Sequence, residues 1–295
     1  MPDRRTPFWL WPNLLSLDAP LVAVAWLFMF ARAWRVDFHP WHAYAALGLT
    51  VWVIYVVDRL IDVRMRPADD PTLGLRHHFH NRHWKKFSVG VLLAIVAVLW
   101  LTLTYLPVEI IGYSIPIIFL VGAFFALVVL VPSTRDIPYW RNIVAGMTFG
   151  TGTALAAHVY VPTEPFWDMM QSREVISFGV LCVLNISAIH LWEHSRRSDD
   201  PEVRAADEIS LTLPLILLGA AALWFAFQDN PGMFGGTVAE TESLTRPFFY
   251  GVLVSAALLQ VINRTRDRYS MDALRSLADA AMIVPLPFFI VFAGN

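Results

Sequence analysis

Two long apolar runs decide the class of fold. They are 87-FSVGVLLAIVAVLWLTLTYL-106 and 108-VEIIGYSIPIIFLVGAFFALVVLV-131, and Glu109 is the only charged residue in either of them. A helix needs about 20 predominantly apolar residues to cross the hydrocarbon core of a bilayer, so each run is long enough to span a membrane. Because the bilayer core offers no water to backbone polar groups, such runs favour α-helices. The sequence therefore predicts an all-α, polytopic membrane protein.

The composition of the whole chain agrees with this prediction. Hydrophobic residues make up 57% of the 295 positions and charged residues only 16%, unlike the average soluble domain. The net charge of −2 gives no reason to expect nucleic acid or another polyanion as a partner. Cys182 is the single cysteine, so no intramolecular disulfide can form. The N-terminus lacks the features of a removable signal peptide, so the first membrane helix is expected to act as its own insertion signal.

Further stretches of similar length lie on both sides of these two runs. Together they predict nine spans in one transmembrane domain, residues 1–295, and the spans cover residues 16–34, 40–57, 87–106, 108–131, 142–161, 175–194, 209–227, 247–262 and 274–292. Proline within some of them is compatible with a membrane helix, since neighbouring helices can satisfy the freed backbone groups.

The distribution of positive charge predicts the orientation. With the N-terminus in the cytoplasm, the 22 Lys and Arg residues all fall inside except four, which are Arg32, Arg35, Arg173 and Arg246. Positive charge in short loops accumulates on the cytoplasmic side, so this orientation in the inner (plasma) membrane is favoured. The cytoplasmic loops are expected at about 58–86, 132–141, 193–208 and 263–273. Nearly all the candidate chemistry lies in or beside these loops.

A pair of carboxylates ends the second predicted span. Asp58 and Asp62 are four residues apart, which places both on one face of a helix and allows them to share a divalent cation. Ionisable groups at membrane depth are costly and usually face a polar interior, which favours a functional role. The structural alternative is a helix end at the membrane surface, with the two aspartates paired to Arg59 and Arg66.

A dense basic cluster, 76-RHHFHNRHWKK-86, precedes the third predicted span. Arg76 and Arg82 suit a phosphate or diphosphate, because arginine donates forked hydrogen bonds and lysine supplies a point charge. The same segment could contact anionic lipid headgroups without any chemistry. A metal site within the cluster is disfavoured, since no second group of ligands has a zinc-type spacing.

The sixth predicted span ends in a third constellation. His190, Glu193 and His194 have the spacing that places two imidazoles and a carboxylate within reach of one cation. This spacing also matches the HxxEH pattern of inverted zinc proteases, although three fixed positions in five arise often by chance. The alternative is a helix end at the membrane surface with polar side chains reaching the water. If the acidic helix ends are functional, residues 58–62 and 190–194 are expected to face one cavity.

Small and hydroxylated residues, 146-GMTFGTGT-153, lie within the fifth predicted span. Small residues let helix backbones approach closely, so helix packing is the first interpretation. Lining of a substrate cavity is the alternative.

Acids after the second span, a basic loop after the fourth and a charged helix end after the sixth together resemble the UbiA superfamily of intramembrane prenyltransferases. The topological resemblance covers almost the whole chain. The family's first motif is an Asn-Asp pair followed by two further aspartates (NDxxDxxxD). Asp58 and Asp62 are similar to the last two aspartates, whereas Ile54 and Tyr55 stand where the family has the Asn-Asp pair.

Two more positions carry the resemblance. Arg135 stands where the family has a diphosphate-binding Lys or Arg, and 141-RNIVAGMTFG-150 is similar to its Pro-Gln-x-x-x-Gly-x-x-Phe-Gly stretch. The resemblance implies a UbiA-like helical bundle in which magnesium and cationic side chains hold a prenyl diphosphate. A prenyl group would pass to an aromatic or other lipophilic acceptor. Membrane lipids would surround the protein.

The resemblance also implies roles for individual residues. Asp58 and Asp62 would hold the first Mg²⁺, and these two with Glu193 would be the catalytic residues. The residues implied to meet the diphosphate are Arg135, Arg76, Arg82, Arg141 and Asn142.

The second acidic motif departs from the family pattern, which has further aspartates (DxxxD-like) at the end of the sixth helix. This chain has Asn185, His190, Glu193 and His194 there, and Glu193 is the best candidate for a second metal ligand. Two imidazoles with one carboxylate form a softer set than magnesium prefers and suit zinc, iron or manganese. Three functions therefore stay open: a divergent prenyltransferase, a membrane metalloenzyme using this cluster, and a non-catalytic lipid-binding or scaffold protein.

Overall fold

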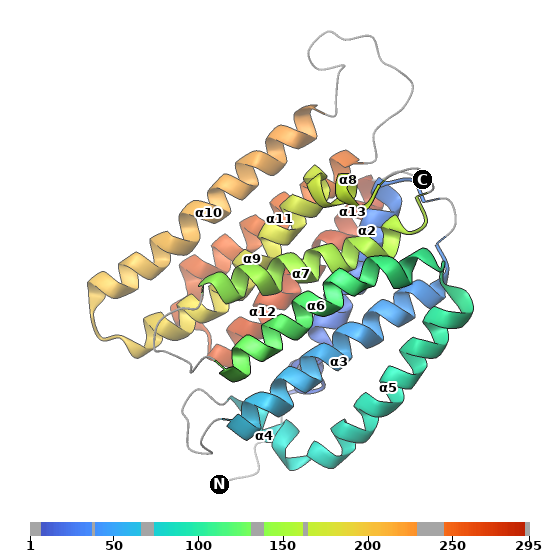
Figure 1. Ribbon diagram of the computed structural model, residues 1–295. Coiled ribbons are helices and arrows are strands. Elements are labelled where there is room, and N and C mark those ends of the chain that lie inside the picture. The colour runs from blue at the N-terminus through green and yellow to red at the C-terminus, as the bar shows by residue number, and fades with distance from the viewer. Residues whose placement is uncertain are drawn as a thin grey trace.

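Long helices running side by side form the protein (Figure 1). The structure is a computed structural model that describes residues 7–36, 39–65, 74–130, 139–161, 165–228 and 245–292. These described residues contain helices and connections but no strand, which confirms the predicted all-α fold.

The first half of the chain contributes one short 3₁₀-helix, η1, and six helices. They are η1 (Phe8–Leu10), α1 (Trp11–Leu14), α2 (Asp18–Ala33), α3 (Trp41–Met65), α4 (Leu75–Arg82), α5 (Trp84–Tyr105) and α6 (Glu109–Leu130). The short helix α4 lies at one end of α3 and packs against it, and α5 runs back beside α3.

The second half contributes the remaining helices and the 3₁₀-helix η3. They are α7 (Tyr139–His158), α8 (Phe166–Gln171), α9 (Arg173–Arg197), α10 (Pro201–Gln228), α11 (Thr245–Thr265), η3 (Arg266–Arg268), α12 (Met271–Ile283) and α13 (Pro285–Phe292). In Figure 1, α5 lies at one edge of the bundle and α10 at the other. Helices α9, α10 and α11 pack closely together, and α7 lies along α9.

Six helical segments of the described chain are long and apolar enough to cross a membrane. They are Trp84–Tyr105, Glu109–Ala126, Arg173–Arg197, Pro201–Gln228, Thr245–Arg268 and Met271–Val291. A seventh is added if Phe8–Leu14 and Asp18–Ala33, which are bent by 83° at their junction, count as one broken span. The predicted membrane class is therefore supported, although not every one of the nine predicted spans passes this test.

The apolar core lies where α2 meets α9, α11 and α12. Trp26 of α2 stacks on Phe178 of α9, with 4.3 Å between the ring centroids, and packs edge-on against Phe248 of α11. Its indole Nε1 donates a hydrogen bond of 2.8 Å to the backbone oxygen of Met282. A buried indole N–H needs such an acceptor, and this one ties the first long helix to the last.

Small residues bring α7 and α9 into backbone contact. A Cβ added at Gly146 would lie 2.5 Å from the backbone nitrogen of Val183, and one at Gly150 would lie 2.8 Å from the Cα of Gly179. Only glycine fits at such distances, so the helix-packing interpretation of this segment is confirmed. The neighbouring Thr148 and Thr153 line a cavity, so part of the segment also has the placement that the second interpretation requires.

Two of the expected loops, 58–86 and 193–208, are largely helical, and most of the expected loop at 132–141 lies outside the described residues. Helix α3 continues to Met65, and the basic cluster forms α4 and the start of α5 rather than a loop. Only residues 198–200 separate α9 from α10, where a loop over 193–208 was expected. Hydropathy marks the point at which a helix becomes polar, whereas backbone hydrogen bonding can continue beyond it. As a result, Asp58, Asp62 and Glu193 lie on rigid helices.

Candidate functional site

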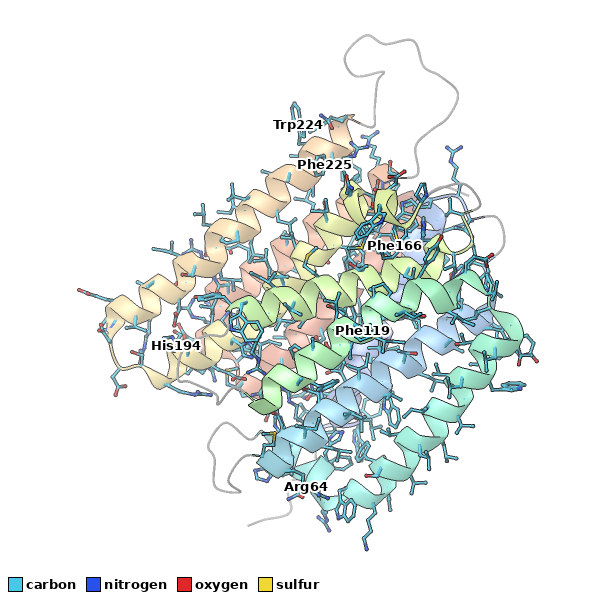
Figure 2. All side chains as sticks on the ribbon, in the orientation of Figure 1. Arg64, Phe119, Phe166, His194, Trp224 and Phe225 are labelled. Carbon is cyan, nitrogen blue, oxygen red and sulfur yellow. The ribbon has the colours of Figure 1, made fainter. Side chains whose placement is uncertain are left out.

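One large cavity, of about 1000 Å³, lies between α3, α5, α6, α7 and α9. Much of its wall is apolar, with contributions from all five helices; examples are Leu47, Leu99, Leu103, Ile115, Ile118 and Phe149. Charged side chains gather at the end nearest α4, and we call six of them the polar end: Asp58, Asp62, Arg76, Arg141, Glu193 and Arg275. Figure 2 shows Arg64 and His194 at this same end of α3 and α9, far from Trp224 and Phe225.

The two carboxylates of α3 both line the cavity, one helical turn apart. Within the described part of the chain, Asp58 forms no hydrogen bond or ion pair, while Asp62 has His77 3.6 Å away. Asp58 is repelled by Asp62 and attracted by the guanidinium groups of Arg59, Arg76 and Arg141. Both acids therefore lie on one helix face and line the cavity, with guanidinium groups near Asp58.

Arg59 does not pair with these aspartates, as the structural alternative required. Its guanidinium pairs instead with residues before and in α2: Nη1 donates to the backbone oxygen of Asn13 at 2.8 Å, and Nη2 lies 3.8 Å from Asp18. Arg66, the other expected partner, lies outside the described residues. The interpretation of Asp58 and Asp62 as acids paired to surface arginines is therefore not supported for Arg59.

Helix α4 covers the polar end and supplies Arg76 and His77 to the cavity. The Nε atom of Arg76 is buried and has no hydrogen-bond partner among the described residues. Burial, together with the nearby guanidinium groups of Arg59 and Arg275, lowers the pKa of Arg76 to about 10. Arg82 is exposed and does not line the cavity, so its expected contact with diphosphate is not part of this site.

Helix α7 brings Arg141 and Asn142 to the same cavity. Asn142 is buried, and its Nδ2 donates a hydrogen bond of 3.1 Å to Ser187 Oγ of α9. The Arg141 guanidinium lies over the ring of Phe124, and its buried Nε has no hydrogen-bond partner in the described chain. Arg135, the other cation expected from the resemblance, lies outside the described residues.

The three polar residues at the end of α9 have different surroundings. Glu193 accepts a hydrogen bond of 2.5 Å from Arg275 of α12 and lies 3.6 Å from Arg197. His194 Nδ1 lies 2.9 Å from Asp207 of α10. His190 lines the cavity. Among the described residues these three side chains do not form a group that could hold a metal ion, as the transition-metal interpretation requires.

The donor chemistry of the polar end fits magnesium better than a transition metal. No group of three or more His, Cys, Asp or Glu side chains in the described residues is placed to hold a metal ion. Magnesium, however, is usually bound by one or two carboxylates together with water and substrate phosphate oxygens. Asp58 and Asp62 are able to supply such a pair.

Sequence reasoning missed several charged residues of the cavity. Arg275 and Asp279 of α12 and Asp18 of α2 all line it, and Asp279 lies within hydrogen-bonding reach of Asp18. A usable signal was present, because Arg275 and Asp279 are charged residues within the last predicted span and Asp18 lies within the first. The charge distribution placed Arg275 simply on the cytoplasmic side, and this gave no indication that its side chain lines the cavity.

Comparisons with protein-family models, with curated proteins and with solved structures find no match for this chain. The family resemblance therefore rests on the motifs and the helix order alone.

Proposed function

We propose that this protein is an intramembrane prenyltransferase of the UbiA type. It would move a prenyl group from a prenyl diphosphate to an aromatic or other lipophilic acceptor. The observation that supports this most is the cavity itself, which joins an apolar body to a polar end built from four helices and α4. An amphiphile with an anionic head and an isoprenoid tail has the same division of chemistry.

The nine-span topology belongs to this proposal. Helices α3 and α7 are not among the segments that are apolar enough to be recognised as membrane spans. They nevertheless contain 25 and 20 residues and lie in the same bundle. At 1.5 Å per residue, both lengths reach the roughly 30 Å of a hydrocarbon core. Both helices line the cavity, so polar residues are placed where they face the substrate rather than lipid. We further propose that the N-terminus and the polar end face the cytoplasm.

The residues of the polar end would act mainly through electrostatics. Asp58 and Asp62 would hold a magnesium ion, which supplies positive charge to the departing diphosphate. Arg76 and Arg141 would bind the diphosphate oxygens and stabilise the charge that develops as the allylic carbon–oxygen bond breaks. The apolar walls would hold the tail and keep water from the reactive carbon.

A second role is supported by the basic surface beside the site. Arg82 and Lys85 are exposed next to Trp84, at the junction of α4 and α5. Such a cluster suits anionic lipid headgroups at a membrane surface. A non-catalytic lipid-binding protein would need this surface but not the paired aspartates.

The test is metal-dependent stabilisation of the detergent-solubilised protein by geranylgeranyl diphosphate. A ligand at about 100 times its Kd should add about 2.7 kcal/mol to the free energy of unfolding of the wild type. Asp58→Asn and Asp62→Asn should abolish this gain, because each retains size and hydrogen bonding but removes charge that the metal needs.

Asp199→Asn is the matched control. Asp199 is exposed and lies 3.8 Å from Arg204, so its loss should leave the response intact, since exposed ion pairs contribute only about 0–1 kcal/mol. A wild type that shows no metal-dependent response to any prenyl diphosphate would refute the enzyme. Recovery of ordinary phospholipid without metal from the purified protein would then favour the lipid-binding role.

A further inference from the structure

Arg275 is the most enclosed cation of the polar end. Its side chain is 5% exposed and is held from two sides, by Glu193 at 2.5 Å and by Asp272 at 3.2 Å. It lines the cavity, and its Nε is buried without a hydrogen-bond partner in the described chain. A buried N–H group without an acceptor is costly, so this N–H group could donate a hydrogen bond to a ligand bound in the cavity.

Arg275 is one of three cavity guanidinium groups with this property. The Nε atoms of Arg76 and Arg141 are likewise buried and unpartnered. Arg76 interacts electrostatically with Arg275 and with Glu193, so these groups are neighbours. Cations this close repel one another, and an anion with several oxygens would satisfy all three.

Glu193 is already committed to Arg275. One carboxylate oxygen accepts from Arg275 at 2.5 Å and the other lies 3.6 Å from Arg197. A carboxylate with a guanidinium on each oxygen has little capacity left for a metal ion. These two contacts indicate that Glu193 orients the Arg275 guanidinium.

We propose that Arg275 binds the diphosphate of the substrate and that Glu193 and Asp272 are positioning residues that hold its guanidinium toward the cavity. This inference rests on the proposed function and replaces the expected role of Glu193 as a second metal ligand. The diphosphate would then be bound by the metal ion at Asp58 and Asp62 of α3 and by the guanidinium of Arg275 of α12.

The experiment measures affinity for inorganic diphosphate and for geranylgeranyl diphosphate by calorimetry while Mg²⁺ is varied. Because Arg275→Gln alone would remove the buried partner of Glu193 and leave only the half-exposed Arg197 beside it, the variant is Arg275→Gln with Glu193→Gln. We expect both ligands to bind about tenfold to a hundredfold more weakly, as for loss of a charge-assisted hydrogen bond. Unchanged affinity in this variant overturns the role of Arg275.

Glu193→Gln alone separates positioning from metal binding. A positioning residue should weaken diphosphate binding while the Mg²⁺ concentration at half-effect stays the same. A metal ligand should instead shift that concentration several-fold, and this result overturns the inference.

Gly74→Ala offers a variant that leaves every charge in place. An added Cβ would lie 2.5 Å from Nη1 of Arg275, and the φ of −76° at Gly74 is one that alanine adopts freely. The methyl group should displace the guanidinium and weaken diphosphate binding while the fold survives. Gly112→Ala is the control, because nothing lies within 4 Å of its added Cβ.

The two ligands distinguish the possible failures. If the wild type binds inorganic diphosphate but no prenyl diphosphate, the proposed function fails and the arginine site stands. If the variants bind both ligands as the wild type does, only the role of Arg275 fails. If the wild type binds neither ligand, both proposals are overturned.

Discussion

The ends of α3 and α9 bring carboxylates to the same cavity, but their surroundings differ. Asp58 of α3 forms no hydrogen bond or ion pair within the described residues. Glu193 of α9, by contrast, is held by Arg275 at 2.5 Å. An acid without a protein partner at the edge of a cavity is available to a ligand, whereas one paired with a buried arginine stabilises the fold and orients that arginine. The same residue chemistry thus serves two purposes at one site.

The difference arises from which helix lies opposite each acid. Asp18 of α2 draws Arg59 away from the α3 acids, through the 3.8 Å ion pair and the bond of Arg59 to Asn13. On α9 itself Glu193 has only the half-exposed Arg197, 3.6 Å away, and its buried partner, Arg275, comes from α12. Availability of a carboxylate is therefore decided by its neighbours across the bundle.

The largest expected effect comes from breaking the α9 pair. Arg275→Met should lower the free energy of unfolding by about 4 kcal/mol, because it leaves Glu193 charged and mostly buried. Adding Glu193→Gln should recover most of the loss, since the buried carboxylate that lost Arg275 is then neutral. Denaturation by SDS in mixed micelles measures both variants. If Arg275→Met is as stable as the wild type, the contrast between the two helix ends is lost.

Adding a methyl group between α7 and α9 should lower the free energy of unfolding somewhat less. Gly146→Ala places a methyl group 2.5 Å from a backbone atom of Val183, which cannot rotate away. Overpacking of this kind costs about 1–3 kcal/mol, and we expect the upper end because backbone must move. The same unfolding assay checks it, with Gly122→Ala as control, since its added Cβ meets nothing within 4 Å. Equal stability of these two variants would contradict the rigid placement of α9.

The stability of the protein should depend on pH through His80 of α4, the helix that covers the polar end. His80 of α4 is fully buried; its Nδ1–H donates to the backbone oxygen of Arg76, and its Nε2 lies 3.1 Å from Ser16 Oγ, a hydroxyl that can donate to the neutral ring. Burial, with the nearby charges of Arg59, Arg76 and His77, lowers the pKa of His80 to about 4.

The sign of the effect follows from the unfolded chain, where histidine has a pKa of about 6.5 and binds the proton more tightly. The stability contributed by the neutral ring is complete above about pH 6.5 and is lost as the pH falls toward 4, and the loss at pH 5 is about 2 kcal/mol. His80→Gln should flatten the pH dependence of stability between pH 7 and 5. An equally steep dependence in this variant would show that another group titrates.

The smallest expected effect is on the stability of Asp58→Asn. Asp58 forms no described bond and has a like charge one turn away at Asp62, so its neutralisation should change the free energy of unfolding by less than about 0.5 kcal/mol. The same variant should lose ligand binding. A large destabilisation would mean that Asp58 supports the fold, and the two helix ends would then be alike.

Much of the candidate site follows from local sequence. The i, i+4 spacing of Asp58 and Asp62 placed both acids on one helix face, and the structure has both of them lining the cavity. The glycines of α7 signalled close packing, and Gly146 and Gly150 meet α9 backbone. Loop boundaries could not be read in the same way, because polar residues continue a helix beyond the apolar stretch.

Sequence alone determined the membrane class, the helical architecture and the candidate acids, since these depend on run length, residue type and spacing along a single helix. Only the tertiary structure decided which acid is available and which is paired. Glu193 and Arg275 are 82 residues apart, and Arg59 is 41 residues from Asp18, so no local period connects them. An ion pair depends on the distance between two charges in space, and for these residues the packing of α12 on α9 and of α2 on α3 sets that distance.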